Sequence, residues 1–233
     1  MAGRATRNGS TPTVLLVHDA FADTGSWAGT LRAGTHLGTD VVAVPNPLRG
    51  LAIDGRYVAA AAAVVDGPVV LVGHGYGGAV ASVAAARADN VVGLVYVAAL
   101  LPPPTGNIID LVRQSGELLA ALVPYRCDAG IELYLSRAAY PSVFAHDLPT
   151  ADAAVAAAQQ RPVLARAFEE RTATVADVPS TYLVATADRV IDAQLQHEAA
   201  ARVGATTTEV DASHAVVLSR PVSVADAIRS ALA

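Results

Sequence analysis

Four positions of this chain could form one reactive centre: Asp19, Gly75, Asp188 and His214 each follow a short apolar run. An imidazole that a carboxylate holds in one tautomer can act as a general base, and Asp188 could supply that carboxylate to His214. A second carboxylate nearby, Asp19, could transfer a proton or hold a water or a substrate hydroxyl. The alternatives are a solvated loop histidine at 214, and an aspartate at 19 that caps the next segment or pairs with Arg49.

Gly75 lies at the centre of the pattern Gly73-His74-Gly75-Tyr76-Gly77. An apolar run, Val69–Val72, precedes this pattern and an alanine-rich helical stretch follows it, in the order typical of a G-x-S-x-G nucleophile elbow. The central residue of such an elbow carries the nucleophilic hydroxyl, and here it is glycine. The sequence therefore predicts the frame of a serine hydrolase without its nucleophile.

The elements that must position these residues alternate along the chain. Six Val-rich, mostly continuous apolar runs predict parallel strands buried on both faces, at Thr13–Val17, Asp40–Val44, Val69–Val72, Val91–Ala98, Ser180–Ala185 and Thr206–Val210. Helical stretches are expected at Ser26–Gly34, Asp54–Val65, Tyr76–Ala88, Asp192–Val203 and Ser223–Leu232. We predict an α/β fold with a doubly wound, mainly parallel sheet of about six strands. Ligands bind such sheets at the carboxyl ends of the strands, where the reactive residues fall.

We predict one core interrupted by an insertion. The core comprises residues 13–100 and 179–233, and residues 101–178 form a helical cap, because a structureless loop of that length is improbable. Residues 1–12 are polar and lack the apolar region of a signal peptide, so we expect a disordered leader.

Composition excludes several classes of protein. A net charge of −5 without a cluster of basic residues argues against a nucleic-acid partner. No apolar run approaches the length needed to span a bilayer, so we expect no membrane association. The single cysteine, Cys127, excludes an internal disulfide and fits a cytoplasmic protein. The apolar composition, 53% hydrophobic residues, is compatible with a homodimer.

Six blocks of sequence, in order, resemble the α/β-hydrolase superfamily. The resemblance is strongest to its small cap-bearing group, which includes actinobacterial α/β-hydrolases, plant methylesterases and hydroxynitrile lyases. The blocks are Val14-Leu-Leu-Val-His-Asp-Ala-Phe21, Pro45-Asn-Pro-Leu-Arg-Gly50, Val95-Tyr-Val-Ala-Ala99, Gln160-Arg-Pro162, Ala187-Asp-Arg-Val-Ile191 and Asp211-Ala-Ser-His-Ala215.

The resemblance implies roles for four residues. Asp188 would be the acid of a catalytic triad and His214 its base, in the family's order along the chain. The backbone N–H groups of Ala20 and Tyr76 would form the oxyanion hole.

Three positions depart from the family's pattern: Gly75 replaces serine, Asp19 replaces glycine, and Asp192 replaces a common proline.

Glycine at 75 fits three hypotheses: an enzyme that has diverged to chemistry without a covalent intermediate, a carboxylesterase or lactonase inactivated by Ser→Gly, or a non-catalytic ligand-binding protein. Because Asp19 is a second change at the same site, we favour the first. The expected enzyme acts by general acid/base chemistry on a small, largely apolar carbonyl compound, in a cyclisation, C–C bond cleavage or formation, elimination or isomerisation. Hydroxynitrile lyases show, by analogy only, that the fold supports non-hydrolytic chemistry.

The remaining aromatic and imidazole side chains are weaker candidates. We predict that His18, Phe21, His74, Tyr125 and His146 border the substrate pocket, although His18 and His74 suit a scaffold role as well. The histidines show no metal-ligand spacing and no dinucleotide motif follows the first strand, so we expect neither a metal nor another cofactor.

Overall fold

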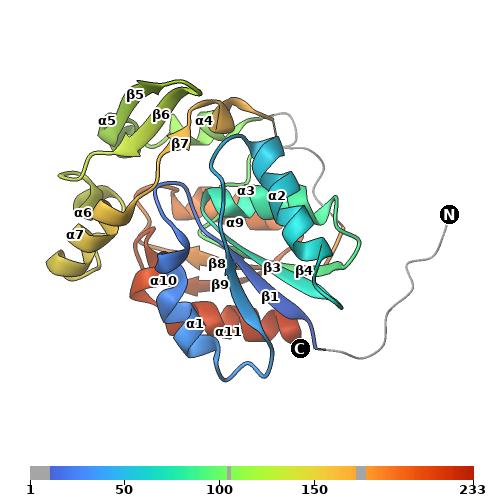
Figure 1. Cartoon of the computed structure of the whole chain (residues 1–233). Helices are drawn as coiled ribbons and strands as arrows, with labels where there is room; N and C mark the ends of the chain where they lie inside the picture. Colours follow the sequence, from blue (N-terminus) through green and yellow to red (C-terminus); the bar gives the residue numbers. More distant parts are fainter. Residues whose placement is uncertain (1–10, 104–105, 172–176) are drawn as a thin grey trace.

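The computed structural model describes residues 11–103, 106–171 and 177–233. Most of the predicted leader, residues 1–10, lies outside the described residues. The central sheet contains six parallel strands in the order β2-β1-β3-β4-β8-β9 (Figure 1). Their bounds are β1 Thr13–Val17, β2 Val41–Val44, β3 Val69–His74, β4 Val91–Val97, β8 Ser180–Ala185 and β9 Thr206–Val210. All six predicted strands are therefore present, each within two residues of the predicted ends.

Helices cover both faces of the sheet, as continuous apolar strands require. One face packs under α2 (Leu51–Ala63), α3 (Tyr76–Ala85) and α9 (Ala193–Arg202), and the other under α1 (Ala28–Gly34) and α11 (Pro221–Leu232). A short 3₁₀ helix, η1 (Thr24–Trp27), precedes α1, and α10 (Val216–Ser219) precedes α11. Trp27 is fully buried between α1 and the sheet.

The insertion between β4 and β8 contains helices, as predicted, and also a sheet that the sequence did not predict. Its helices are α4 (Ile108–Val112), α5 (Gly116–Ala121), α6 (Tyr140–Val143), α7 (Thr150–Gln159) and α8 (Arg166–Glu169). Antiparallel strands β5 (Leu122–Cys127), β6 (Gly130–Leu135) and β7 (Val163–Leu164) lie among them. In the sequence, Pro124 argues against a strand at this position. In the structure, β5 is an edge strand, where a missing backbone N–H is tolerated.

The insertion covers the carboxyl ends of the central strands, as Figure 1 shows. Its second half is bonded to the loop after β2. Leu164 donates from its backbone N–H to the Leu48 carbonyl at 3.0 Å, Arg166 donates to the Arg49 carbonyl at 2.8 Å, and Arg49 forms an ion pair with Glu132 of β6. On the other side, the Ala215 N–H donates to the Phe144 carbonyl at 2.9 Å. The insertion is therefore attached to the core from two directions.

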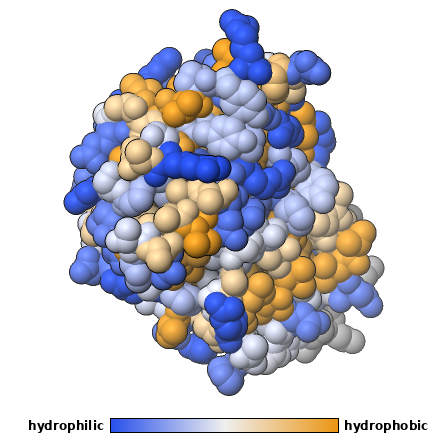
Figure 2. Space-filling view, turned by 60° about the vertical axis from the view of Figure 1, so that its left-hand side comes forward, coloured by the Kyte–Doolittle hydropathy of each residue, from blue (hydrophilic) through white to orange (hydrophobic). Residues whose placement is uncertain are grey.

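The surface that carries the insertion mixes polar and apolar side chains (Figure 2). Several large apolar side chains of the insertion are exposed, namely Leu119, Val123, Tyr125, Ile131 and Val155. In the described part of the chain, no helix is both long and apolar enough to cross a membrane.

Candidate functional site

Four parallel strands deliver the reactive residues to one place. Asp19 follows β1, Gly75 lies between β3 and α3, Asp188 follows β8 and His214 follows β9. The side chains of Asp19, Asp188 and His214 are at most 3% exposed. The structure thus brings together residues that are up to 195 positions apart in the chain.

Asp188 holds the imidazole of His214 in one orientation. The Nδ1–H of His214 donates to Asp188 Oδ2 at 2.7 Å. The other carboxylate oxygen accepts from the backbone N–H groups of Val190 and Ile191, and Gln196 Nε2 donates to Oδ2 at 2.9 Å. Gln196, which is fully buried in α9, was not predicted from the sequence. The only sequence feature that could have indicated its role is a polar residue on the buried face of this helix. These four donors fix the Asp188 carboxylate, so Nδ1 of His214 carries the proton.

Asp19 contacts the opposite nitrogen of the same imidazole. His214 Nε2 lies 3.0 Å from Asp19 Oδ2, and the backbone N–H of Tyr76 donates to Asp19 Oδ1 at 2.5 Å. The imidazole is therefore enclosed between two buried carboxylates, one on each ring nitrogen.

The two carboxylates stabilise the protonated imidazole. Burial alone would lower the pKa of His214, but the charges of Asp188 and Asp19 and their hydrogen bonds raise this pKa to about 10. Burial alone would raise the pKa of Asp19, but the hydrogen bond and the charge of His214 lower it. At neutral pH the carboxyl group of Asp19 is therefore ionised and the imidazole of His214 is protonated. The two carboxyl groups and the imidazole between them form an array of three buried side chains.

Gly75 leaves space that the Asp19 side chain fills. Its φ of 52° and ψ of −121° define a sharp turn between β3 and α3, and a positive φ suits glycine. A Cβ at this position would lie within 2.5 Å of all three atoms of the Asp19 carboxyl group. Asp19 in this conformation therefore requires glycine at position 75.

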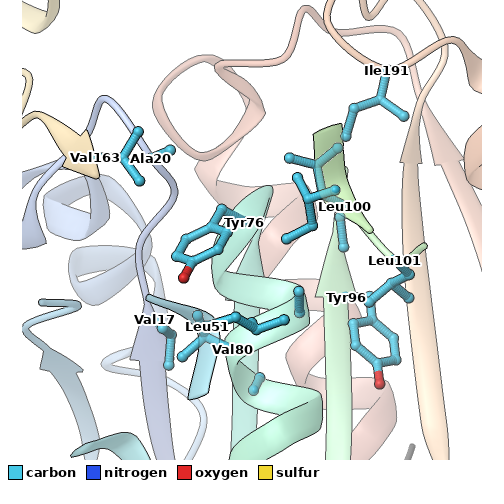
Figure 3. Packing of buried hydrophobic residues seen from close by; sticks show 14 of the residues in the cluster. Val17, Ala20, Leu51, Tyr76, Val80, Tyr96, Leu100, Leu101, Val163 and Ile191 are labelled. Carbon is cyan, nitrogen blue, oxygen red and sulfur yellow. The ribbon is translucent and has the colours of Figure 1, made fainter. Parts of the chain in front are cut away.

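The resemblance implied an oxyanion hole formed by two backbone N–H groups, and these two groups differ in their hydrogen bonding. The Tyr76 N–H is occupied by Asp19, whereas the Ala20 N–H has no hydrogen-bond partner among the described residues. The Tyr76 ring points from the start of α3 towards Val17 and Leu51 (Figure 3), and its hydroxyl donates to Asp54 Oδ2 at 2.7 Å. The predicted hole is thus half occupied by the protein's own carboxylate.

Three of the predicted pocket residues are histidines whose side chains form hydrogen bonds with the backbone. His18 donates from Nδ1 to the Asp19 carbonyl and accepts the Asn46 N–H at Nε2, and burial lowers its pKa. His74 donates from Nε2 to the His214 carbonyl at 2.8 Å, and burial lowers its pKa to about 4. His146 donates from Nε2 to the Ala187 carbonyl at 2.8 Å. Each of these imidazoles is therefore held by a backbone carbonyl near the site.

The two aromatic candidates lie in different environments. Phe21 is buried in the loop after β1, edge to face with Phe168 at 6.3 Å. Tyr125 is 40% exposed on β5, where it bonds Glu132 and stacks on Tyr134. It borders neither of the two clefts described below, and its strand is an edge strand of the unpredicted sheet. Its place at the substrate pocket therefore stays a prediction.

Two clefts lie next to the buried array. The larger, of about 310 Å³, lies between η1, α7 and α10, and Tyr140, Phe144, Leu148 and His74 contribute to its walls. The smaller, of about 260 Å³, borders Asp188. Neither is lined by Asp19, Gly75 or His214. The Phe144 ring lines the larger cleft and lies 4.8 Å from the His214 ring, so this side chain separates the cleft from the array.

Two members of this array, Asp19 and His214, form a set of possible metal ligands together with the neighbouring His74. One ligand atom from each of Asp19, His74 and His214 lies within 4.8 Å of the other two. The sequence argument against a metal relied on local spacing of histidines. Local spacing could not detect three ligands that come from three different strands.

Comparison with known proteins identifies the family. The alpha/beta hydrolase family model matches residues 14–227, so the chain belongs to the α/β-hydrolase family. No curated protein matches the chain. Among solved structures, a pyrethroid hydrolase from Sphingobium faniae is similar with a TM-score of 0.81 and 21% identity, covering 96% of this chain and 98% of that chain.

Two further structures show the same fold. Polyneuridine aldehyde esterase has a TM-score of 0.79 at 19% identity, over 95% of this chain and 99% of its own. A methylesterase from Arabidopsis has a TM-score of 0.78 at 17% identity, over 95% and 98% respectively. At these identities the likeness concerns the fold alone.

Proposed function

We propose that this chain is an α/β-hydrolase-fold enzyme that acts by non-covalent acid/base chemistry on a small, largely apolar carbonyl compound. The observation that carries the proposal is the Asp19 carboxylate, which lies where a side chain at position 75 would lie and bonds the imidazole of His214. The family's nucleophilic hydroxyl has been replaced by glycine, and a carboxylate from the neighbouring loop has taken its place.

Each member of the array has a distinct role in this mechanism. His214, held as an imidazolium, donates a proton to the developing oxyanion, and Asp188 orients it. Asp19 is the base that accepts a proton from the carbon next to the carbonyl or from a hydroxyl. The free N–H of Ala20 helps to bind the oxyanion, and the Tyr76 N–H joins it when Asp19 is protonated and releases that bond.

The larger cleft is the proposed binding site. Its size is at the lower end of ligand pockets, and apolar side chains such as Tyr140 and Leu148 line it. A rotation of the Phe144 side chain would connect this cleft to His214, because Phe144 touches both. These features support a compact substrate with an apolar body and one polar carbonyl group.

Two rival functions use the same residues. In the first, the chain is a carboxylesterase or lactonase inactivated at position 75, which the fold shared with two esterases favours. In the second, the chain binds a ligand without turnover, which the burial of His214 and Asp19 favours, because neither of the two clefts reaches these side chains.

Hydrogen–deuterium exchange tests the acid/base proposal. We expect chelator-treated protein in D₂O to exchange the α-protons of some members of a panel of small ketones and lactones, followed by proton NMR. Asp188→Asn should lower this rate by about 10⁴-fold, as loss of the orienting carboxylate does in a catalytic triad. Asp19→Asn, which keeps the side-chain shape, should remove the exchange.

The control is His197→Gln, an exposed histidine of α9 that lies outside the array. Its exchange rate should equal that of the unmodified protein. Compounds that bind the unmodified protein without any exchange would favour the ligand-binding alternative, and exchange that survives Asp19→Asn would exclude Asp19 as the base.

A further inference from the structure

We propose that Asp19, His74 and His214 form a binding site for one divalent transition-metal ion, such as Zn²⁺. The inference goes beyond the proposed function, since an ion bonded to Nε2 of His214 takes the place of the proton that the acid/base mechanism uses. The metal-bound and the acid/base forms are therefore alternative states of the same array.

The spacing of the three side chains is close to that of ligands on one ion. Their ligand atoms lie within 4.8 Å of one another, and Asp19 Oδ2 is 3.0 Å from His214 Nε2. In the tetrahedral geometry of zinc, bonds of about 2.0–2.2 Å place two ligand atoms about 3.3–3.6 Å apart. Asp19 and His214 are already near this spacing, and the ligand atom of His74 would have to approach them by up to roughly 1.3 Å when the ion binds.

The hydrogen bonds of both imidazoles resemble those of metal ligands. A ligating histidine usually donates its other ring N–H to a carboxylate or a backbone carbonyl. His214 donates from Nδ1 to Asp188, and His74 donates from Nε2 to the carbonyl of His214. The remaining nitrogen of His74, Nδ1, is fully buried and has no hydrogen-bond partner among the described residues. Such an unpaired buried acceptor is costly unless it has a ligand.

The charge of the array favours a cation. Asp19 and Asp188 are both buried, and their hydrogen-bond partners in the described structure are backbone N–H groups, Gln196 and His214. No arginine is bonded to either carboxylate among the described residues. A divalent ion would balance the two carboxylates, whereas a protonated His214 balances only one of them.

The ligand set selects the class of ion. Two imidazole nitrogens and one carboxylate oxygen suit zinc, cobalt, nickel or iron(II), whereas Mg²⁺ and Ca²⁺ prefer all-oxygen sites. Asp188, bonded to the far nitrogen of His214, would act as the carboxylate that orients a metal-bound histidine.

Calorimetric titration of chelator-treated protein with Zn²⁺ tests the site without any substrate. We expect one ion per chain, and a rise of roughly 5–10 °C in the unfolding temperature at a free Zn²⁺ concentration of 100 times the dissociation constant. Asp19→Asn and His74→Gln should each weaken binding at least tenfold. His197→Gln should leave it unchanged, because this exposed imidazole pairs with Glu209 outside the array.

A measurement on the unmodified protein guards against variants that do not fold. Co²⁺ should shift or broaden the side-chain NMR signals of His74 and His214 far more than those of His36 and His197. No saturable binding, or binding that only His197→Gln weakens, would overturn the proposal. Because this test needs no turnover, its failure would leave the acid/base proposal standing, and loss of turnover would leave the metal site standing.

Discussion

The double variant Asp19→Gly with Gly75→Ser should gain serine-hydrolase reactivity, whereas Gly75→Ser alone should not. A serine Cβ at position 75 would collide with the Asp19 carboxyl group, so the single variant has no room for its side chain. Removing Asp19 creates that room and also frees the Tyr76 N–H for an oxyanion. The remaining pair, Asp188 and His214, is already positioned to activate a hydroxyl.

The expected gain is large. Removal of the nucleophilic serine from a serine hydrolase lowers turnover by about 10⁶-fold. Even a poorly aligned serine should therefore raise the rate of aryl-ester hydrolysis by roughly 10³-fold. Covalent labelling by a fluorophosphonate probe and hydrolysis of short-chain aryl esters measure the two effects. The single variant should in addition be less stable by about 1–3 kcal/mol, because serine adopts a positive φ there and displaces Asp19.

Two controls make the result specific. Asp19→Gly alone should show no labelling, because it contains no hydroxyl at the turn. His214→Ala in the double variant should remove the labelling. If Gly75→Ser alone labels as well as the double variant, the Asp19 side chain moves away freely, and the inactivated esterase becomes the better interpretation. If the double variant stays inert although it folds, a serine at position 75 is not sufficient for hydrolase activity at this site.

The sequence predicted the central sheet well, because parallel strands buried on both faces leave a strong signal. Runs such as Val69–Val72 are continuous and apolar, and all six became strands. The insertion was predicted less completely. Half-exposed strands such as β5 have no clear alternation, and the pairing of β7 with β6 depends on contacts between distant segments.

The candidate site, like the fold, could be predicted only in part from the sequence. The order of motifs brought Asp19, Asp188 and His214 into one prediction, and the structure places them in contact. The sequence could not show that Asp19 occupies the space left by Gly75, since that depends on the loop after β1 folding over α3. Nor could it place Phe144 between the cleft and His214. Both facts arise from packing between elements, for which a single sequence gives no local signal.

The metal-free protein should be most stable near pH 6.5, with stability falling on both sides. His214 has a pKa of about 10 in the folded state against 6.5 for an unperturbed histidine, so its contribution is complete below pH 6.5 and is lost as pH rises towards 10. His74 has a pKa of about 4, so its contribution is complete above pH 6.5 and is lost as pH falls towards 4. The two slopes have opposite signs in adjacent windows, and each amounts to roughly 1 kcal/mol per pH unit.

Thermal or urea unfolding of chelator-treated protein between about pH 4 and about pH 10 measures both slopes of the free energy of unfolding against pH. His214→Gln should flatten the alkaline side, because the buried carboxylates then have no imidazolium to stabilise. His74→Gln should reduce the acid slope, part of which remains because burial also lowers the pKa of His18, while His197→Gln should leave both slopes intact. A plateau from neutral pH upwards in the unmodified protein would mean that His214 is neutral between its two carboxylates. Asp19 would then face an uncharged partner, and His214 could not supply the proton that the proposed acid/base mechanism requires.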